Sequence, residues 1–192
     1  MHLLETIREP FRVAAAQAAL PIDGPRARIL DRLVALAAEL IETPIAILTI
    51  VEAHRQVFAA HVGLPEEMAE AGSSPLEYSI CQHAVARGLP VIVDDARQDP
   101  LLRDNRAVFE LGVAAYAGIP LITADSLALG TMCVADMVPR HWSDDQLAQL
   151  TLLADIATDQ FELQRYERAA EFRRVWAGVG ESNWLSPQRS GV

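Results

Sequence analysis

The spacing of apolar residues changes along the chain, and each change marks a new element. Between residues 26 and 42 apolar side chains recur three and four positions apart, which predicts an amphipathic helix. Residues 44–51 are almost all apolar and rich in β-branched side chains, as is typical of a strand buried on both faces. Residues 55–62 follow a short turn, and we expect them to form the hairpin partner of that strand.

The middle of the chain favours short elements. Residues 63–75 are rich in Gly, Ser and Pro, which predicts a loop, and 77–87 have the pattern of a short helix. A brief strand is expected at 90–93. An Asp-Pro pair at 99–100 matches a helix N-cap followed by proline at the first helical position, which predicts a helix over 100–111.

The last part of the chain predicts a second hairpin and a long helix. Residues 113–122 and 127–135 have the composition of paired strands, and Pro139 ends the sheet. The sequence Ser-Asp-Asp-Gln at 143–146 forms a capping box, from which a helix is expected to run over 144–172.

These elements predict an α+β domain. We expect a central antiparallel sheet of five to six strands, with the N- and C-terminal helices on one face and short helices and loops on the other, where they roof a pocket. The predicted organisation is a helical leader at 1–25, a folded domain at 26–166, and the end of the last helix with a polar tail at 167–192.

The net negative charge of the chain makes some classes of binding partner unfavourable. The chain of 192 residues carries 26 acidic and 16 basic side chains, a formal net charge of −10, which disfavours binding to nucleic acid or to anionic membranes. Charged residues interrupt the N-terminal apolar stretch, which argues against a secretory signal, and no apolar run approaches the ~20 residues of a spanning helix. The expected location is therefore the cytoplasm.

Five stretches carry a family resemblance when they are taken in order. They are RQVF at 55–58 with GL at 63–64, YSICQHAV at 78–85, VDDARQDP at 93–100 with DN at 104–105, YAGIPL at 116–121, and LGTMCVAD at 129–136 with PR at 139–140. Together they resemble the GAF domain family, especially the GAF domains that precede bacterial output domains such as histidine kinases and diguanylate cyclases. The resemblance covers residues 26–166 and implies a ligand cavity on the sheet face opposite the terminal helices.

The resemblance implies a regulatory, small-molecule-sensing module and no enzyme. Its ligand and any cofactor are unknown, and it is expected to act through a dimer or a separate signalling output protein. One alternative is a free methionine sulfoxide reductase, because Cys81 lies near a cysteine position of those GAF enzymes. Residues 106–118, where their nucleophilic cysteine is expected, hold none, so Cys81 and Cys133 are interpreted as small buried side chains. The other alternative is a dimerisation module with no ligand.

The candidate pocket combines aromatic rings with neutral hydrogen-bonding groups. Gly118 and Gly130 leave room for a close approach of backbone or ligand in the two late strands. Each pocket residue is equally compatible with an ordinary packed core. The candidate ligand-binding residues are Phe58, Ser79, Cys81, Phe109, Tyr116 and Thr131.

Other ligand classes match the sequence poorly. Covalent bilin attachment calls for a histidine directly after the cysteine, whereas His83 follows Cys81 by two positions. The cyclic-nucleotide signature of these domains lacks its lysine here. Four acidic residues could bind a metal ion or act as an acid–base pair. Their positions favour roles in helix capping and turns instead, so no metal site is expected. They are Asp94, Asp95, Asp99 and Asp104.

The last helix carries more apolar residues than one sheet face needs. We therefore predict a homodimer formed by the terminal helices, although the helix at 26–42 of the same chain is an alternative partner for the surplus. The predicted stripe is Leu147, Leu150, Ala154, Ala157 and Phe161, with Leu153, Ile156 and Leu163 off it.

Overall fold

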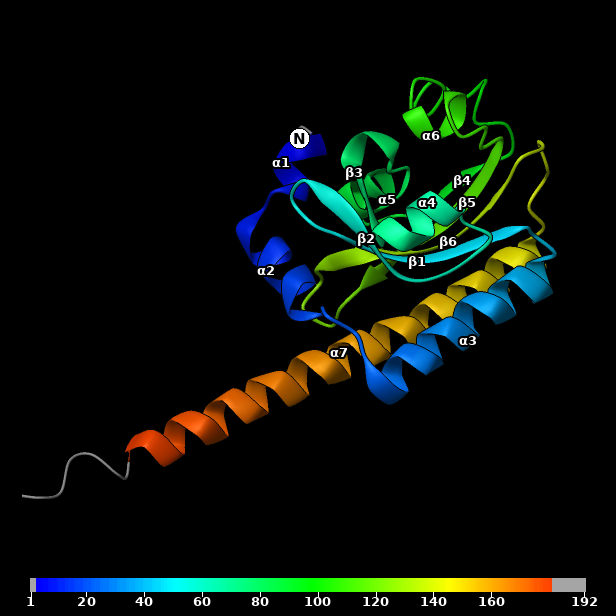
Figure 1. Ribbon diagram of the computed structural model, residues 1–192. Helices are drawn as coiled ribbons and strands as arrows, with labels where there is room; N and C mark the ends of the chain where they lie inside the picture. The colour runs from blue at the N-terminus through cyan, green and yellow to red at the C-terminus, as the bar shows by residue number, and fades with distance from the viewer. Residues whose placement is uncertain (1–2, 181–192) are drawn as a thin grey trace, which may run out of the picture.

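A single antiparallel sheet organises the chain, which a computed structural model describes over residues 3–180 (Figure 1). Its strand order is β3-β2-β1-β6-β5-β4, so the two long hairpins lie side by side through β1 and β6. The predicted α+β class and both hairpins are confirmed. The strands are β1 (Ile45–Val51), β2 (Arg55–Val62), β3 (Ser73–Pro75), β4 (Val91–Val93), β5 (Ala115–Ile122) and β6 (Ala128–Asp136).

Two long helices, α3 (Gly24–Ile41) and α7 (Asp144–Gly180), pack side by side on one face of the sheet (Figure 1). Their apolar positions meet alternate residues of the central strands and form the larger core, because helix spacing and strand alternation each direct one set of side chains inward. Fully buried members of this core include Leu30, Val34, Leu48, Met132 and Phe161.

The predicted interface stripe of the last helix belongs to this core. Leu150, Ala154, Ala157 and Phe161 are at most 1% exposed within one chain, so they contact the sheet and α3 instead of a second copy. The surplus that remains outside is a different set. It includes Leu152, Ile156, Leu163 and Tyr166 on α7 with Ile29, Leu36 and Leu40 on α3.

Short elements cover the opposite face of the sheet, as predicted. The helix α5 (Cys81–Arg87) contacts β5 and β6, and α1 (Leu3–Ile7) packs against α5. Further short elements are α4 (Glu66–Ala71), the 3-10 helix η1 (Leu76–Tyr78) and α6 (Arg106–Phe109).

Two predictions for this middle region were wrong in detail. The segment 63–75 is not only a loop, since it contains α4 and the edge strand β3. Residues 100–111 do not form one helix. Asp99 does accept hydrogen bonds from the backbone of Leu101 and Leu102, but the chain only turns there, and the α6 helix starts at a second cap, Asn105, whose side chain accepts from the Ala107 amide.

The N-terminal segment packs against one end of the sheet. Its second helix, α2 (Pro10–Ala18), places alanines in the core beneath α3 and α7, while Ile7 of α1 joins the core of the opposite face. Arg12 of α2 is buried and donates hydrogen bonds to the carbonyls of Val51 and Ala128, at the ends of two neighbouring strands. Within residues 3–180, no helix has the length and apolarity needed to cross a membrane.

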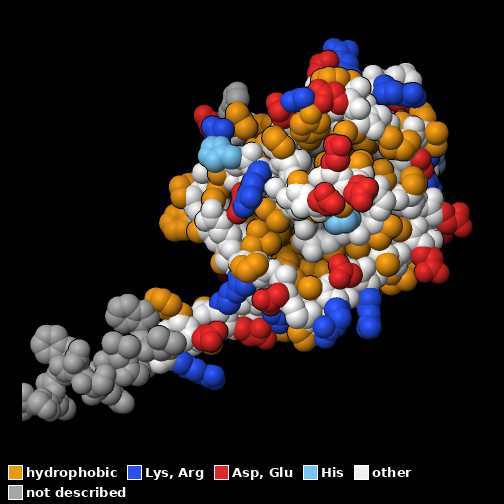
Figure 2. Space-filling model, viewed as in Figure 1, with side chains coloured by type: hydrophobic (Ala, Val, Ile, Leu, Met, Phe, Trp, Pro, Cys, Tyr) orange, Lys and Arg blue, Asp and Glu red, His pale blue; other side chains and the backbone are white. Residues whose placement is uncertain are grey.

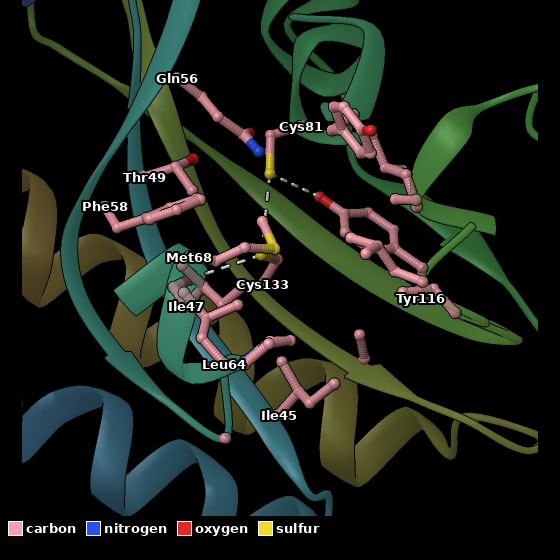
Figure 3. A pocket seen from close by; sticks show the side chains of 18 of the residues that line it. Ile45, Ile47, Thr49, Gln56, Phe58, Leu64, Met68, Cys81, Tyr116 and Cys133 are labelled. Carbon is pink, nitrogen blue, oxygen red and sulfur yellow. Dashed lines mark hydrogen bonds between the residues drawn. The ribbon is translucent and has the colours of Figure 1, made fainter. Parts of the chain in front are cut away.

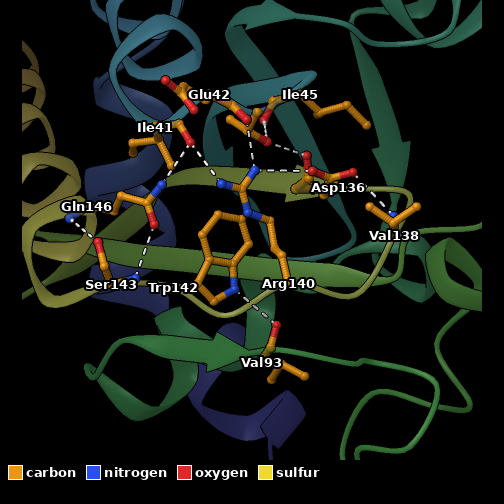
Figure 4. A network of polar contacts seen from close by, with 12 residues as sticks. Ile41, Glu42, Ile45, Val93, Asp136, Val138, Arg140, Trp142, Ser143 and Gln146 are labelled. Atoms are coloured by element: carbon orange, nitrogen blue, oxygen red, sulfur yellow. Dashed lines mark hydrogen bonds and ion pairs between the residues drawn. The ribbon is translucent and has the colours of Figure 1, made fainter.

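Arg140 joins the end of α3 to the end of β6 (Figure 4). Its guanidinium donates to the carbonyls of Ile41 and Glu42 at 3.0 and 2.8 Å and pairs with Asp136 at 3.1 Å. Gln146 also donates to the Ile41 carbonyl, at 3.0 Å, and exchanges the predicted capping-box hydrogen bonds with Ser143. The unpaired carbonyls at the end of α3 are thereby satisfied by side chains from the other end of the chain.

We expect Arg140→Ala to lower the free energy of unfolding by about 2 kcal/mol. The Glu42 carbonyl and the Asp136 carboxylate lose this partner, and the Ile41 carbonyl keeps only the Gln146 donor. Urea denaturation monitored by circular dichroism measures this change. Arg103→Ala is the matched control, since the Arg103 side chain is 60% exposed and pairs only loosely with Asp104. Equal losses for the two variants would contradict the role assigned to Arg140.

Candidate functional site

A cavity of about 260 Å³ lies between the sheet and its short-element cover (Figure 3). Its floor comes from β1, β2, β5 and β6, and α4, α5 and α6 contribute to its other walls. Its lining contains no Asp, Glu, Lys, Arg or His side chain. The cavity therefore suits an uncharged and mostly apolar occupant, because an ion would lose its hydration there without gaining a partner of opposite charge.

Strand alternation places the floor residues. Ile45, Ile47 and Thr49 project from the same face of β1, two positions apart. Across the antiparallel ladder between β1 and β6, Cys133 lies opposite Ile47 and Ala135 lies opposite Ile45. Directly opposed residues share a face of the sheet, so Cys133 and Ala135 also face the cavity.

Two thiols and a phenol meet at the wall of the cavity (Figure 3). The sulfur atoms of Cys81 and Cys133 are 3.8 Å apart, and the Tyr116 hydroxyl donates to the Cys81 sulfur at 3.4 Å. Cys133 also lies 3.4 Å from the Ile47 carbonyl oxygen, which its thiol is placed to reach. The sequence predicted two buried thiols, and the fold brings them into contact although they are 52 residues apart.

Burial and hydrogen bonding shift the pKa values of the two thiols in opposite directions. The hydrogen bond from Cys133, together with neighbouring hydroxyl donors, lowers the pKa of Cys81, against the opposing effect of burial. The same contact and burial raise the pKa of Cys133 well above its usual value. Burial also raises the pKa of Tyr116, so its hydroxyl keeps its proton and acts as a donor. Cys81 is thus the more acidic thiol of the pair.

Gly118 makes room for the Tyr116 ring. A Cβ atom at position 118 would collide with the phenol of Tyr116, two residues earlier on the same face of β5. The expectation that Gly118 permits a close approach is correct, but the approaching group is a side chain of the same strand. The ring can therefore lie flat along β5 and direct its hydroxyl toward Cys81.

A buried set of amides and hydroxyls positions α5. The Ser79 hydroxyl donates to the Gln56 side chain at 2.7 Å and accepts from the Gln82 amide at 3.1 Å. The Gln56 amide continues to Ser74 at 2.9 Å, and Gln82 donates to the carbonyls of Leu76 and Ser79. These bonds join β2, β3 and the turn before α5, and they fix the helix that carries Cys81.

The six candidate residues divide into three groups. Phe58, Cys81 and Tyr116 line the cavity. Ser79 and Thr131 are fully buried beside it but do not line it, and their hydroxyls form hydrogen bonds with Gln56 and with Thr49.

Phe109 needs correction as a pocket residue. It is 62% exposed at the end of the four-residue helix α6, where Ala107 lines the cavity instead. The prediction placed it on a long helix over 100–111, and the shorter helix presents a different side chain inward.

The sequence interpretation missed several lining residues. Ile47, Thr49 and Cys133 could have been found by continuing the alternation of their strands from Phe58 and Tyr116 across the sheet. Met68 had no such signal, since it lies on α4, within the segment expected to be a loop.

The four acidic residues have separate structural partners. Asp95 pairs with Arg97 at 2.9 Å, Asp94 contacts His141 at 3.0 Å, and Asp99 caps the following turn. Asp104 is exposed beside Arg103. Among the residues that the structure describes, no group of three or more His, Cys, Asp or Glu side chains is arranged to hold a metal ion.

One curated relative is similar to part of this sequence. Over 113 residues the chain is 37% identical to a cyclic di-GMP phosphodiesterase of Pseudomonas aeruginosa, a match that covers 58% of this chain and 18% of that protein. The chain thus spans less than a fifth of that relative's length.

Solved structures with the same fold are more distant in sequence. The GAF domain of a phosphoenolpyruvate-protein phosphotransferase from Coxiella burnetii superposes with a TM-score of 0.64 at 16% identity, over 88% of this chain and 99% of that chain. A free methionine-R-sulfoxide reductase from Neisseria meningitidis gives 0.60 at 18% identity, over 80% and 86%. The GAF-B domain of DevS from Mycobacterium smegmatis gives 0.57 at 21% identity, over 76% and 98%. Residues 25–159 match the family model of the GAF domain, and the chain belongs to that family.

Proposed function

We propose that this protein is a regulatory sensory module of a signalling system, without catalytic turnover, whose cavity binds a small uncharged molecule. The observation that carries the proposal is the cavity of about 260 Å³, which short elements partly cover and which no Asp, Glu, Lys, Arg or His side chain lines. The 37% identity to part of a cyclic di-GMP phosphodiesterase supports a signalling context. Cyclic nucleotides are poor candidates for the ligand, because their phosphates would find no cation in the lining.

The protein surface beside the cavity is acidic and also disfavours the approach of anionic ligands. Acidic side chains gather over α4, the helix that contributes Met68 to the cavity wall (Figure 2). Glu66, Glu67 and Glu70 of this helix are exposed. The negative potential of this surface repels an approaching anion and leaves neutral molecules unaffected.

The sheet offers a short route from the cavity to the long helices. Tyr116 faces the cavity, whereas its neighbour Ala117 belongs to the core beneath α3 and α7. Cys133 and Met132 alternate in the same way on β6. A ligand that shifts the cavity side of these strands therefore shifts the surface on which α7 rests, and α7 carries the change to an output segment or partner protein.

Binding can be tested with indole, a neutral aromatic probe, and with indole-3-carboxylate as its anionic counterpart. Ligand-observed NMR is expected to detect indole binding, and the carboxylate should bind at least about tenfold more weakly because its charge is not compensated in the cavity. Ala135→Leu fills part of the cavity and should weaken indole binding by a similar factor. Ala124→Leu, at an exposed turn position, is the control. Tighter binding of the carboxylate would contradict the proposal.

We also propose that the module forms a homodimer through the apolar residues left outside the core. Ile29, Leu36 and Leu40 lie seven and four positions apart on α3, and Leu152, Ile156 and Leu163 follow one line on α7. Because these helices pack against each other, their exposed lines form one continuous surface that a second copy can cover isologously.

Leu152→Glu is expected to convert the dimer to a monomer in light scattering at micromolar concentrations, since it places a charge in an apolar interface. Thr151→Glu adds the same charge at the adjacent exposed position and should leave the dimer intact. A monomer for the unmodified protein, or dissociation of both variants, would contradict this interface.

A second candidate function is the reduction of free methionine sulfoxide, favoured by the pair of thiols at the cavity wall and by the fold shared with the Neisseria meningitidis enzyme. Turnover of free methionine-R-sulfoxide with dithiothreitol, abolished by Cys81→Ser, would establish it in place of the non-catalytic module.

A further inference from the structure

We propose that Cys81 and Cys133 form a redox site that is oxidised to a disulfide by an organic hydroperoxide bound in the cavity. The inference uses the cavity of the proposed function but does not depend on that function, because it concerns a covalent reaction of the two thiols. Each sulfur lines the cavity, and the two are 3.8 Å apart.

The geometry favours oxidation over metal binding. A structural soft-metal site usually needs four ligands, and the described part of the chain offers no third His, Cys, Asp or Glu near the two sulfurs. A disulfide needs only the pair. Its sulfur–sulfur bond of about 2.05 Å requires a closure of less than 2 Å, which a small shift of α5 toward β6 can supply.

The two thiols have distinct places in the reaction. Cys81 accepts a hydrogen bond from Tyr116 and is in hydrogen-bond contact with Cys133, which favours its thiolate, and it projects from the short helix α5 into the cavity wall. Cys133 lies behind it on the rigid central strand β6 and keeps its proton. Cys81 is therefore the attacking sulfur and Cys133 the resolving one.

The chemistry balances with the hydroperoxide as oxidant. The Cys81 sulfur attacks the terminal peroxide oxygen, the S–O bond forms as the O–O bond breaks, and the alkoxide leaves as the alcohol with the proton released from the thiol. The Cys133 sulfur then attacks Cys81, the S–S bond forms, and the S–O bond breaks. The hydroxide leaves as water with the Cys133 proton. Two thiols are oxidised, and one hydroperoxide is reduced to alcohol and water.

The lining selects the class of hydroperoxide. Apart from the sulfurs, the Tyr116 hydroxyl, Thr49 and Gln56, the walls are mostly aliphatic and aromatic. An aromatic or alkyl hydroperoxide gains from burying its hydrocarbon part there, whereas hydrogen peroxide does not. The two thiols therefore react with organic hydroperoxides in preference to hydrogen peroxide.

The test treats the reduced protein with one equivalent of cumene hydroperoxide and measures the intact mass. The expected product has lost two hydrogen atoms and is no longer alkylated by iodoacetamide after denaturation, and a non-reducing gel shows it as a single chain. The sequence contains two cysteines, so these readouts have one assignment. Thiols that remain fully alkylatable, or a disulfide between two chains, would overturn the proposal.

Variants separate the two roles. Cys133→Ser should stop at a Cys81 sulfenic acid that dimedone traps, whereas Cys81→Ser, or Cys81→Ala as a second replacement, should react at least about tenfold more slowly. Equal reactivity of the two single variants would overturn the assignment of Cys81 as the attacking sulfur.

Two comparisons test the part played by the cavity. Cumene hydroperoxide should react about tenfold faster than hydrogen peroxide at equal concentration, and Ala135→Leu should remove that advantage. Indole binding to the Cys81→Ser/Cys133→Ser protein tests the proposed sensory function separately, because that protein keeps the cavity and lacks the thiols. Faster oxidation by hydrogen peroxide would exclude the cavity as the source of selectivity.

Discussion

Gly130→Ala is expected to lower the free energy of unfolding by about 3 kcal/mol or more. Gly130 lies in β6 opposite Ile50 of β1, at the junction of the two hairpins. A Cβ atom there would collide with the carbonyl of Thr49 and would come within 2.9 Å of the Ile50 Cα. Both are backbone atoms of the central strand, so the collision can be relieved only by separating the strands.

The requirement at Gly130 is for space and not for an unusual backbone conformation. Gly88 is the matched control, because its φ of +62° is left-handed but nothing lies within 4 Å of a Cβ built there. Gly88→Ala should therefore cost only about 1 kcal/mol of conformational strain. Urea denaturation of both variants compares them directly. A loss at Gly130 no larger than that at Gly88 would show that the strands move apart easily.

The order of the large elements was predictable because each is determined by its own local pattern. The β-branched apolar run of β1 and the three-and-four spacing of α3 do not depend on distant contacts, and their observed bounds differ from the predicted ones by at most two residues. The helix over 100–111 failed for the opposite reason. Its N-cap is correct, but Leu102 is drawn fully into the core beneath the short elements, and the chain turns to accommodate it.

The candidate site was less predictable because tertiary packing assembles it. The contact between Cys81 and Cys133 depends on the distance between α5 and the sheet. The buried hydrogen bond between Ser79 and Gln56 helps to set this distance. No local pattern encodes that distance. The stripe at Leu150 illustrates the same limit, since its spacing fits a dimer interface and an internal core equally well, and the sheet occupies it.

Arg12→Ala should destabilise the protein by about 3 kcal/mol, the other large loss we expect. The Arg12 side chain is 4% exposed, and it donates to the Ile7 carbonyl at 2.9 Å and to Val51 and Ala128 at 2.7 and 3.3 Å. Burial lowers the pKa of its guanidinium, which nevertheless stays charged at neutral pH. Truncation leaves three carbonyls without this donor, in a place closed to bulk water.

The same substitution tests whether the N-terminal helices belong to the folded unit. Ile7 of α1 is fully buried against the layer that contains α5, so release of α1 would also loosen the helix that carries Cys81. Arg12→Lys should recover less than half of the lost stability, because one ammonium cannot reproduce the planar fork of donors. Arg8→Ala is the control, since Arg8 is exposed and makes one long hydrogen bond, at 3.4 Å. Urea denaturation with limited proteolysis near residues 10–20 measures both effects. If Arg12→Ala resists protease and denaturant as well as Arg8→Ala does, residues 1–25 are an appendage and the folded domain begins at α3.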